Sequence, residues 1–207
     1  MAALVEVKDI CKIYNPGENE VRALDHVSVS IQEKEFVAII GHSGSGKSTL
    51  MNMLGCLDVP TSGSYFLHGK DVSRMSDDEL SDVRNREIGF IFQGFNLIAN
   101  LTALEKVGLG QRMSHKPSEM SGGQQQRVAI ARAIAQAPPV ILADEPTGNL
   151  DSGSTKEIMS ILKQLHREGR TVILITHDND IAAQARRVIR IKDGKIEADF
   201  EQQVEDW

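Results

Sequence analysis

The feature that most constrains this chain is a glycine-rich loop that follows a short apolar run. Residues 41–48 read Gly-His-Ser-Gly-Ser-Gly-Lys-Ser and match the pattern G-x-x-x-x-G-K-S/T. The run Phe36–Ile40 has the length of a buried strand, and the sequence favours a helix over 48–57. Glycines let the backbone wrap closely around phosphate oxygens, and a helix N-terminus presents partial positive charge to them. The order strand, loop, helix therefore predicts a nucleotide phosphate site on an α/β fold.

Individual roles within this loop follow from the chemistry of its side chains. We expect Lys47 to reach the β- and γ-phosphates and the Ser48 hydroxyl to bind Mg²⁺. The other residues expected to contact the nucleotide are Gly41, Ser43, Gly44, Ser45, Gly46 and Thr49.

Two adjacent carboxylates follow a second apolar run. Residues 140–143 read Val-Ile-Leu-Ala and lead directly into Asp144 and Glu145. A carboxylate at the end of a buried strand beside a phosphate loop can hold Mg²⁺, often through water, so Asp144 is a predicted metal ligand. Glu145 is predicted to face the attacking water, as a general base or as a group that orients the water. The alternative is a strand that ends in a solvated acidic turn.

Short apolar runs alternate with helical segments along the rest of the chain. Such runs are typical of strands covered on both faces, as in a parallel sheet. The runs are 36–40, 88–92, 140–143, 172–175 and 188–191. The opening differs, because Val27, Val29 and Ile31 alternate with serines, which indicates a half-buried strand. We therefore expect a mostly parallel sheet preceded by an antiparallel part.

Capping residues indicate where the helices begin and end. The pattern of a capping box occurs at Ser76 with Glu79 and at Thr102 with Glu105. A further helix is expected over 121–136, because Ser121 can cap it and two prolines follow it. Apolar residues at helical spacing over 158–165, followed by Gly169, predict another.

Composition narrows the class of protein. The 207 residues are 41% hydrophobic and 25% charged, which is close to the average of soluble globular domains. No apolar run approaches the length of a membrane-spanning helix, and the N-terminus does not resemble a signal peptide. The two cysteines cannot form a disulfide framework or a four-ligand zinc site, which favours a reducing cytosol. A net charge of −6 argues against a dedicated nucleic-acid binder.

Residues 120–127, Met-Ser-Gly-Gly-Gln-Gln-Gln-Arg, resemble the signature sequence of ATP-binding-cassette ATPases, with Met120 where leucine is usual. The segment precedes the Asp144–Glu145 pair by about twenty residues, as the resemblance requires. In that family the signature contacts the ATP held by a partner chain. The residues to which the resemblance assigns this role are Ser121, Gly122, Gly123 and Gln124.

Four further residues fall where the same resemblance expects functional side chains. Tyr14 matches the aromatic residue that stacks on adenine, and Asp151 lies in a segment similar to the D-loop. Gln93 matches the Q-loop glutamine, which implies a catalytic and a metal-binding role. His177 matches the switch histidine, which implies a catalytic contact with the γ-phosphate. The resemblance implies a P-loop NTPase core with a mostly parallel sheet, an N-terminal antiparallel β subdomain and a helical subdomain, with ATP and Mg²⁺ bound.

Several segments are most similar to the branch of the family that contains lipoprotein-release and macrolide-exporter ATPases. These segments are 55–58, 95–98, 101–105, 115–119 and 142–151. The resemblance implies an ATPase subunit that powers a transporter by ATP-driven head-to-tail dimerisation. Its expected partners are a second copy or another ABC ATPase and a membrane permease subunit, but no nucleic acid. We expect it in the cytoplasm, peripheral on the inner face of the cell membrane.

The interval between Gln93 and Ser121 departs from the family pattern. Only 27 residues separate them, whereas the family carries about two more helices, roughly 25 residues, at this place. We therefore expect a single domain over 1–207 with a truncated α-helical subdomain at about 94–137, and a mobile segment over 102–120. A natural minimal cassette, an engineered deletion and an omitted disordered stretch each account for the short interval.

Three other functions remain open at this point. A regulatory cassette that binds ATP with little turnover is favoured by the short interval, although Glu145 argues against it. A cell-division-type cassette ATPase is a near relative of the expected branch. An ATPase acting on nucleic acid is disfavoured, because such cassettes carry coiled-coil insertions or a second cassette.

Overall fold

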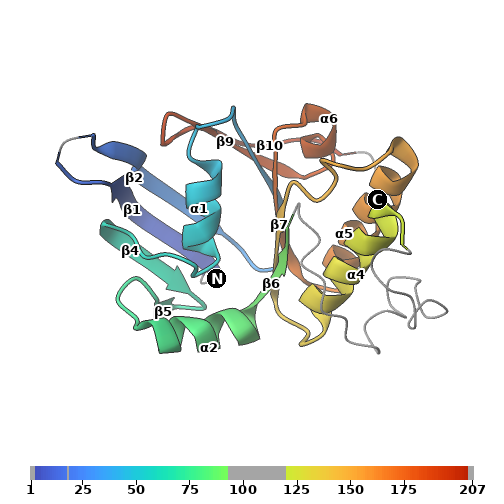
Figure 1. Ribbon diagram of the computed structural model, residues 1–207, viewed down its shortest axis with the longest axis horizontal. Coiled ribbons are helices and arrows are strands. Elements are labelled where there is room, and N and C mark those ends of the chain that lie inside the picture. The colour runs from blue at the N-terminus through green and yellow to red at the C-terminus, as the bar shows by residue number, and fades with distance from the viewer. Residues whose placement is uncertain (1–2, 18, 93–119, 205–207) are drawn as a thin grey trace.

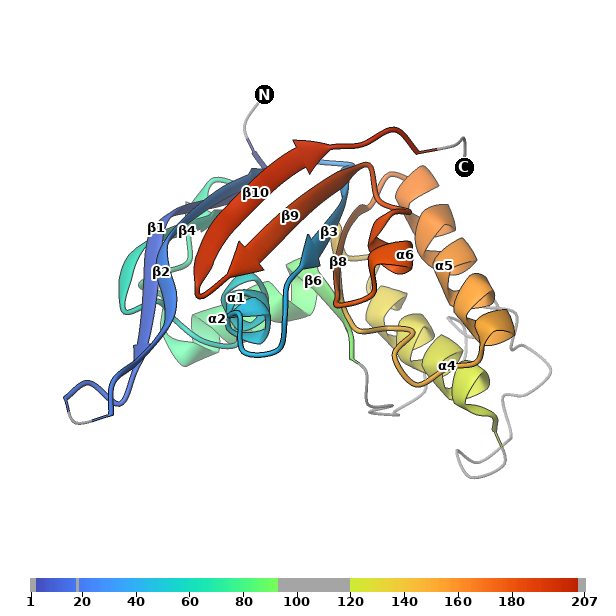
Figure 2. The ribbon, with the colours of Figure 1, turned by 90° about the horizontal axis from the view of Figure 1, so that it is seen from above.

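A computed structural model describes residues 3–17, 19–92 and 120–204, and these form a layered α/β fold (Figure 1). A six-stranded sheet lies in the middle of the molecule. A four-stranded sheet and helix α1 (Lys47–Leu54) lie on one side, and helices α4 (Gly122–Ile134) and α5 (Ser152–Arg167) lie on the other (Figures 1 and 2). The predicted fold class is confirmed.

The four-stranded sheet is antiparallel throughout, with the strand order β2-β1-β4-β5. Its strands are β1 (Val5–Tyr14), β2 (Val21–Ile31), β4 (Ser62–Leu67) and β5 (Lys70–Asp71). The alternation predicted at the end of β2 is confirmed, since Val27, Val29 and Ile31 are buried and Ser28 is exposed. This sheet therefore presents one apolar face to the rest of the domain.

The six-stranded sheet has the order β10-β9-β3-β8-β7-β6. The strands are β3 (Phe36–Ile40), β6 (Ile88–Ile91), β7 (Val140–Asp144), β8 (Thr171–Thr176), β9 (Arg187–Lys192) and β10 (Lys195–Glu201). All neighbouring pairs are parallel except β9 with β10. The five predicted apolar runs form the five parallel strands of this sheet.

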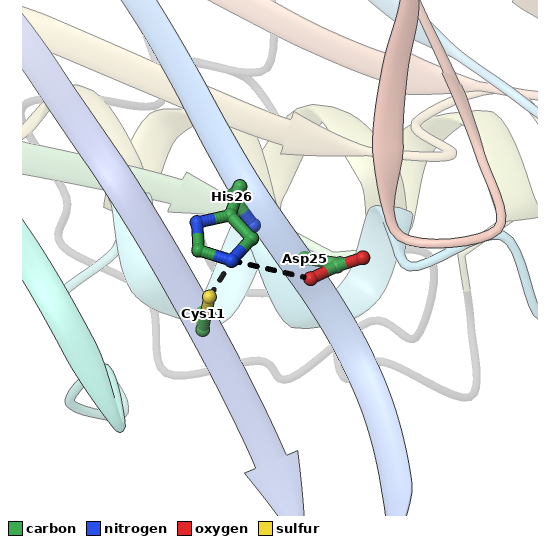
Figure 3. A group of neighbouring side chains, drawn as sticks. All are labelled: Cys11, Asp25 and His26. Carbon is green, nitrogen blue, oxygen red and sulfur yellow. Dashed lines mark hydrogen bonds and ion pairs between the residues drawn. The ribbon is translucent and has the colours of Figure 1, made fainter.

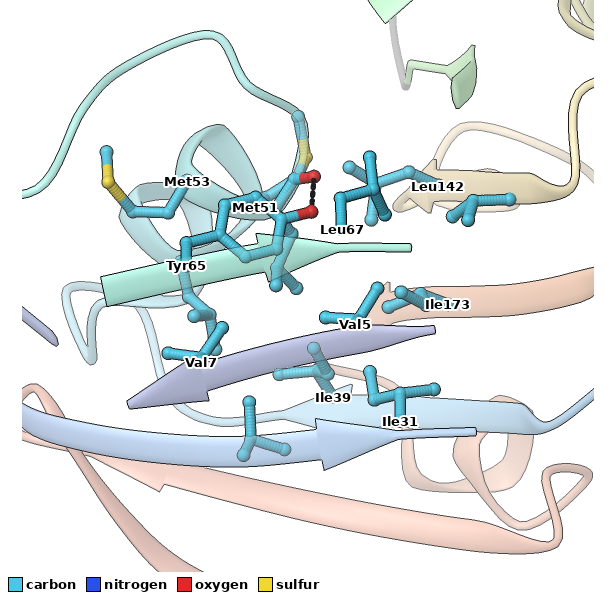
Figure 4. Close-up of a cluster of buried hydrophobic side chains, with 14 of the residues drawn as sticks. Val5, Val7, Ile31, Ile39, Met51, Met53, Tyr65, Leu67, Leu142 and Ile173 are labelled. Carbon is cyan, nitrogen blue, oxygen red and sulfur yellow. Dashed lines mark hydrogen bonds between the residues drawn. The ribbon is translucent and has the colours of Figure 1, made fainter. Parts of the chain in front are cut away.

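Two apolar cores fill the spaces on either side of this sheet. Val37 and Ile39 of β3 point into the core shared with the antiparallel sheet and α1. Figure 4 shows part of that core, where Val5 of β1 lies near Ile39 and Met51 of α1 belongs to the same cluster. Phe36, the first residue of β3, points into the opposite core with α4 and α5. Because both faces are covered, every residue of β3 is buried, which explains its unbroken apolar sequence.

Capping residues set the helix boundaries largely as predicted. Both side-chain hydrogen bonds of a capping box are present at Ser76, before α2 (Asp77–Glu87), and at Ser121, before α4. The helix α5 ends at Arg167, and Gly169, which follows the C-cap residue Glu168, has a φ of +93° that suits its place after the helix. Two predicted helices are shorter than expected, because Cys56 after α1 and Ala137 after α4 adopt left-handed backbone conformations.

Four elements were not predicted from the sequence, namely the strands β4, β5 and β10 and one short helix. The strands β4 and β5 form one hairpin and β9 and β10 another, and a short helix α6 (Asn179–Ala182) follows β8. The predicted helix start at Thr102, the predicted mobile segment up to residue 119 and Gln93 lie outside the described residues. Within the described ranges, no helix combines the length and the apolar character needed to cross a lipid bilayer.

Candidate functional site

The carboxyl ends of four neighbouring parallel strands bring the predicted site residues to one edge of the sheet. The phosphate loop leaves β3, His177 follows β8, and Asp144 is the last residue of β7. The neighbouring strand β6 ends at Ile91, two residues before Gln93, which is outside the described residues. Ligands of open α/β sheets bind at this edge, so the topology supports the site that the motifs predicted.

The phosphate loop is held in shape by close backbone contacts. Gly46 has a φ of +103°, and a Cβ atom there would lie 2.5 Å from the carbonyl oxygen of Ala23. The turn between β9 and β10 braces the loop, because the amide of Gly194 donates to the carbonyl of Ser45 at 2.9 Å. The helix α1 begins directly after Gly46 with no side-chain cap and no acidic residue in its first turn. Its first amides are thus left for an anion.

Two polar side chains of the loop are placed differently. The Lys47 ammonium lines the cleft and donates to the carbonyl oxygens of Gly41, at 2.6 Å, and His42, at 2.8 Å. The predicted site residue Ser45 does not line the cleft. Its hydroxyl oxygen is buried, with 4% of the residue exposed, and has no hydrogen-bond partner in the described part of the chain.

Asp144 has the environment of a metal ligand. Its pKa is raised, first by burial and then by the negative charge of Glu145, while Lys47 acts in the opposite direction. A half-buried carboxylate beside a second one is stabilised by a cation, and carboxylate and hydroxyl oxygens suit Mg²⁺. Asp144 and Ser48 both line the same cleft. The residues present therefore fit Mg²⁺ bound together with a nucleotide.

Glu145 and His177 are in direct contact. The Nδ1 atom of His177 lies 2.6 Å from Oε1 of Glu145, and the Thr176 hydroxyl donates to Oε2 at 3.2 Å. The side chain of Glu145 is 14% exposed and that of His177 is 68% exposed. The carboxylate is thus oriented by two groups of the neighbouring strand end, as expected for a base that must be positioned.

These residues surround a cleft of about 1070 Å³. The predicted site residues that line it are Gly41, Ser43, Gly44, Gly46, Lys47, Ser48, Thr49, Asp144, Glu145 and His177. Lining residues that the sequence did not indicate include Val21, Arg22, Ala23, Asn179, Arg190 and Lys192. They come from β2, α6 and β9 and belong to no motif, so only the folded arrangement reveals them.

Tyr14 lies beside this cleft without lining it. It is the last residue of β1, and it pairs with Val21, which does line the cleft. The Tyr14 hydroxyl donates to Oδ2 of Asp58 at 3.2 Å. Burial and the charge of Asp58 raise the pKa of Tyr14, whereas a hydrogen bond with Thr49 acts in the opposite direction. The contact with Thr49 ties the tyrosine to the beginning of α1.

The signature segment lies elsewhere. None of Ser121–Gln124 lines the cleft formed by the described residues. Ser121 is exposed at the N-terminus of α4, and Gly123 packs against Ser154 of α5. Asp151 caps α5, because its Oδ1 and Oδ2 atoms accept from the amide and hydroxyl of Ser154. The predicted signature and D-loop residues are therefore joined to each other and separate from their own phosphate loop.

One group of possible metal ligands occurs outside the cleft in the described part of the chain. The donor atoms of Cys11, Asp25 and His26 lie within 4.8 Å of one another (Figure 3). The Asp25 carboxylate is already paired with Lys195, at 3.0 Å, and Arg22, at 3.3 Å, and its pKa is lowered, first by Lys195. The Cys11 sulfur accepts the backbone amide of His26. A metal would have to displace these partners, so we assign the group a structural role.

Comparison with known proteins agrees with this geometry. The family model described as "ABC transporter" matches residues 24–148. The chain is 52% identical to the macrolide export ATP-binding/permease protein MacB of Hyphomonas neptunium, over 95% of this chain and 34% of that protein. It is 47% identical to an uncharacterized ABC transporter ATP-binding protein of Thermotoga maritima, over 95% of both chains.

The alignments also show a difference in length between this chain and its relatives. The alignment with the Hyphomonas protein spans 221 positions, but 95% of the 207 residues here is about 197 residues. About 24 positions of that relative therefore have no counterpart in this chain, and the Thermotoga alignment of 222 positions gives about 25. The chain spans about a third of the length of the MacB proteins that it matches.

The fold has solved counterparts. The ATP-binding cassette MJ0796, in a dimeric post-hydrolysis state bound to ADP and Pi, matches with a TM-score of 0.86 and 42% identity, over 96% of this chain and 99% of that one. The cassette MJ1267 shares the fold, with a TM-score of 0.85 at 24% identity. The chain therefore belongs to the ABC transporter family, as one of its ATP-binding cassettes.

Proposed function

We propose that this chain binds ATP with Mg²⁺ in the cleft at the strand ends and hydrolyses it to power a membrane transporter. The observation that carries the proposal is the convergence of Lys47, Asp144, Glu145 and His177 on one cleft. They come from three separate segments of the sequence, and each supplies chemistry that phosphoryl transfer needs. The domain is proposed to extend over 1–207.

Binding is assigned to the phosphate loop and Tyr14. The loop amides and Lys47 hold the phosphates, and Tyr14 stacks on the adenine. Ser48 and Asp144 would hold Mg²⁺, with Gln93 as a further ligand on the strength of its sequence position. When bound, the ion neutralises charge on the phosphates. The uncapped first amides of α1 and the raised pKa of Asp144 support this assignment.

Hydrolysis is assigned to Glu145 with support from His177. Glu145 takes a proton from the water that attacks the γ-phosphorus, and the bond between that phosphorus and the β–γ bridging oxygen breaks, which leaves ADP and phosphate. His177 and Thr176 hold the carboxylate in place before ATP binds. With ATP present, His177 is proposed to contact the γ-phosphate from its exposed position.

A complete site is proposed to need two chains arranged head to tail. Residues 41–49 of one chain and Ser121–Gln124 of the other would enclose each ATP. The separation of the signature from its own cleft supports this arrangement, since the amides at the start of α4 then face a partner. The cassette MJ0796, which is 42% identical, is described as dimeric. Asp151 lies beside the signature and is proposed to act at the same interface.

The proposed partners are a second copy or another ABC ATPase and a membrane permease, which places the chain at the cytoplasmic face of a membrane. The relatives named MacB are ATP-binding/permease proteins, and this chain matches about a third of their length. That match supports a permease partner.

Light scattering of the Glu145→Gln variant tests the two-chain site. This change keeps the size of the side chain and removes the base, so we expect an ATP-dependent dimer that persists. Ser121→Asp in the same variant retains a good helix cap but directs negative charge at the partner's phosphate, and it should abolish the dimer. Ser121→Asn is the neutral control of the same shape. Equal dimerisation of the Asp and Asn variants would contradict the head-to-tail arrangement.

A regulatory cassette with weak turnover is the second candidate. The observation that favours it is the set of about 24 positions of the relatives that this chain lacks. These missing positions support the proposal of a shortened helical subdomain at about 94–137. A shortened subdomain would leave fewer helices packed against the signature segment. Phosphate release measured at saturating ATP separates the candidates, because only the ATPase turns over many times per chain.

A further inference from the structure

Tyr14 is held by two charged residues that no motif includes. Lys12 precedes it by two residues on β1, in a part of the strand where the pairing with β2 is irregular. The Lys12 ammonium lies 5.1 Å from the centre of the Tyr14 ring. Asp58 follows α1 in the chain and is 44 residues away from Tyr14 in sequence. The three side chains meet only because the fold brings β1 beside the end of α1.

The Asp58 carboxylate joins the lysine to the tyrosine. Its Oδ1 atom accepts from the Lys12 ammonium at 2.7 Å and from the Val59 amide at 2.8 Å, and its Oδ2 atom accepts from the Tyr14 hydroxyl. Lys12 also donates to the Val59 carbonyl at 2.8 Å. Burial alone would raise the pKa of Asp58, but the bonds from Lys12, Val59 and Tyr14 lower it. The carboxylate is therefore ionised and fully engaged at neutral pH.

This network fixes the tyrosine in a way that suits stacking. The hydroxyl is anchored at the edge of the ring, and the ammonium covers one face within cation–π distance. A base can then stack only on the opposite face. The Lys12 side chain is 13% exposed, so its position is set by packing as well as by charge. An aromatic residue at the exposed end of a strand would otherwise lose side-chain entropy when a base binds.

We propose that Lys12 and Asp58 are positioning residues for base recognition, which hold the Tyr14 ring ready to stack on the adenine of ATP. The inference rests on the proposed role of Tyr14 in ATP binding. It assigns phosphate recognition to the cleft, built by the loop, and base recognition to a neighbouring group beside the cleft, built by Lys12, Tyr14 and Asp58. Loss of Lys12 should then affect nucleotides that have a base and spare a base-free triphosphate.

The test compares binding of ATP with binding of inorganic triphosphate, both with Mg²⁺, by calorimetry on the full chain. Lys12→Met should weaken ATP binding by about three- to tenfold and leave triphosphate binding unchanged. Tyr14→Ala should weaken ATP binding by about 5- to 150-fold, the range of a lost base stack. Lys12→Arg keeps the charge and should restore most of the affinity.

A matched control lies on the same strand. Lys8 also places its ammonium over an aromatic ring, 5.0 Å from the centre of Phe66, and pairs with Glu6. The partners of Lys8 are Phe66 and Glu6, and neither has a proposed role in nucleotide binding. Lys8→Met therefore makes the same chemical change to the same kind of contact and should leave both affinities unchanged.

The outcomes distinguish the inference from the proposed function. If Lys12→Met weakens ATP and triphosphate equally, or weakens neither, the positioning role is wrong. If Tyr14→Ala leaves ATP binding intact, the base stack itself is wrong. In the Tyr14→Ala background, Lys12→Met should have no further effect on ATP, because it acts through the ring. Should Lys12→Met fail to fold, Asp58→Asn, which removes the charge that holds the network, must show the same selective effect. It must weaken ATP binding and leave triphosphate binding unchanged.

Discussion

The contact between the signature and the D-loop helix gives a prediction with a magnitude. A Cβ atom on Gly123 would lie 2.5 Å from Oγ and 2.8 Å from Cβ of Ser154. Ser154 cannot easily turn away, because its hydroxyl and amide are bound to Asp151. Gly123→Ala must therefore move α4 and α5 apart. Overpacking of this kind lowers the free energy of unfolding by about 1–3 kcal/mol. The better helix propensity of alanine offsets this loss by up to about 1 kcal/mol. We expect a net loss of up to about 2 kcal/mol, a fall in Tm of up to about 8 °C in a chain of this size.

Thermal unfolding and phosphate release of the same variant test this expectation. ATP affinity should persist, because the phosphate loop lies in the other part of the site, whereas turnover should fall with the displaced signature. Gly153→Ala is the matched control, since its Cβ would meet only Oδ1 of Asp151, at 3.1 Å. Adding Ser154→Gly to Gly123→Ala should recover stability relative to the sum of the single changes. A Gly123→Ala protein as stable and active as the wild type would refute the proposed tight contact.

Three further changes probe the cleft. Lys47→Ala should weaken ATP binding roughly 10- to 150-fold, the loss of one charged hydrogen bond, and unchanged affinity in a titration would contradict its role. Glu145→Gln should slow phosphate release about 10²- to 10⁴-fold at saturating ATP without weakening binding, whereas near-normal release would show that Glu145 is not the base. Asp144→Asn should stop Mg²⁺-dependent turnover yet stabilise the nucleotide-free protein at neutral pH. The raised pKa of Asp144 means that the folded state holds the proton more tightly than the unfolded state. The contribution of Asp144 to the free energy of unfolding therefore falls as the pH rises above about 3.8. At higher pH the ionised carboxylate continues to destabilise the folded state. Thermal unfolding as a function of pH measures this slope, and an Asp144→Asn variant less stable than the wild type would contradict the sign.

The central sheet could be predicted because its strands are covered on both faces. All residues of β3 and β8 are buried, so β3 is an unbroken apolar run and β8 is an apolar run with a threonine at each end, and both stand out without any periodicity. The phosphate loop and Asp144 follow such runs directly, which places them at the same edge of the sheet once the strands are parallel. This local continuity explains why most of the cleft was accessible to prediction.

The strands β4, β5 and β10 were missed because they carry a weaker pattern. In β10 no residue is fully buried, so its sequence has little apolar signal. The turn that leads into β10 consists of Asp193 and Gly194, which both have positive φ angles and form the two-residue loop typical of tight hairpins. His68 and Gly69 also have positive φ angles and form the two-residue loop between β4 and β5.

Two features of the site lie beyond what local sequence can indicate. Asp58 meets Lys12 across 46 residues of chain, and nothing near either residue marks the contact. The separation of the signature from the cleft is likewise a property of the folded chain. Both depend on tertiary packing, which single-residue patterns do not encode.

Phosphate release from a mixture of two inactive variants tests the central claim most directly. Lys47→Ala damages the loop of its own site, and Ser121→Asp damages the signature offered to a partner. A mixed dimer then holds one site with an intact loop and an intact signature. Our account predicts that each variant alone is inactive and that an equal mixture recovers activity, up to about a quarter of the wild-type rate if pairing is random. A mixture that forms mixed dimers, shown by copurification of differently tagged chains, yet releases no more phosphate than the separate variants would contradict a site shared between two chains.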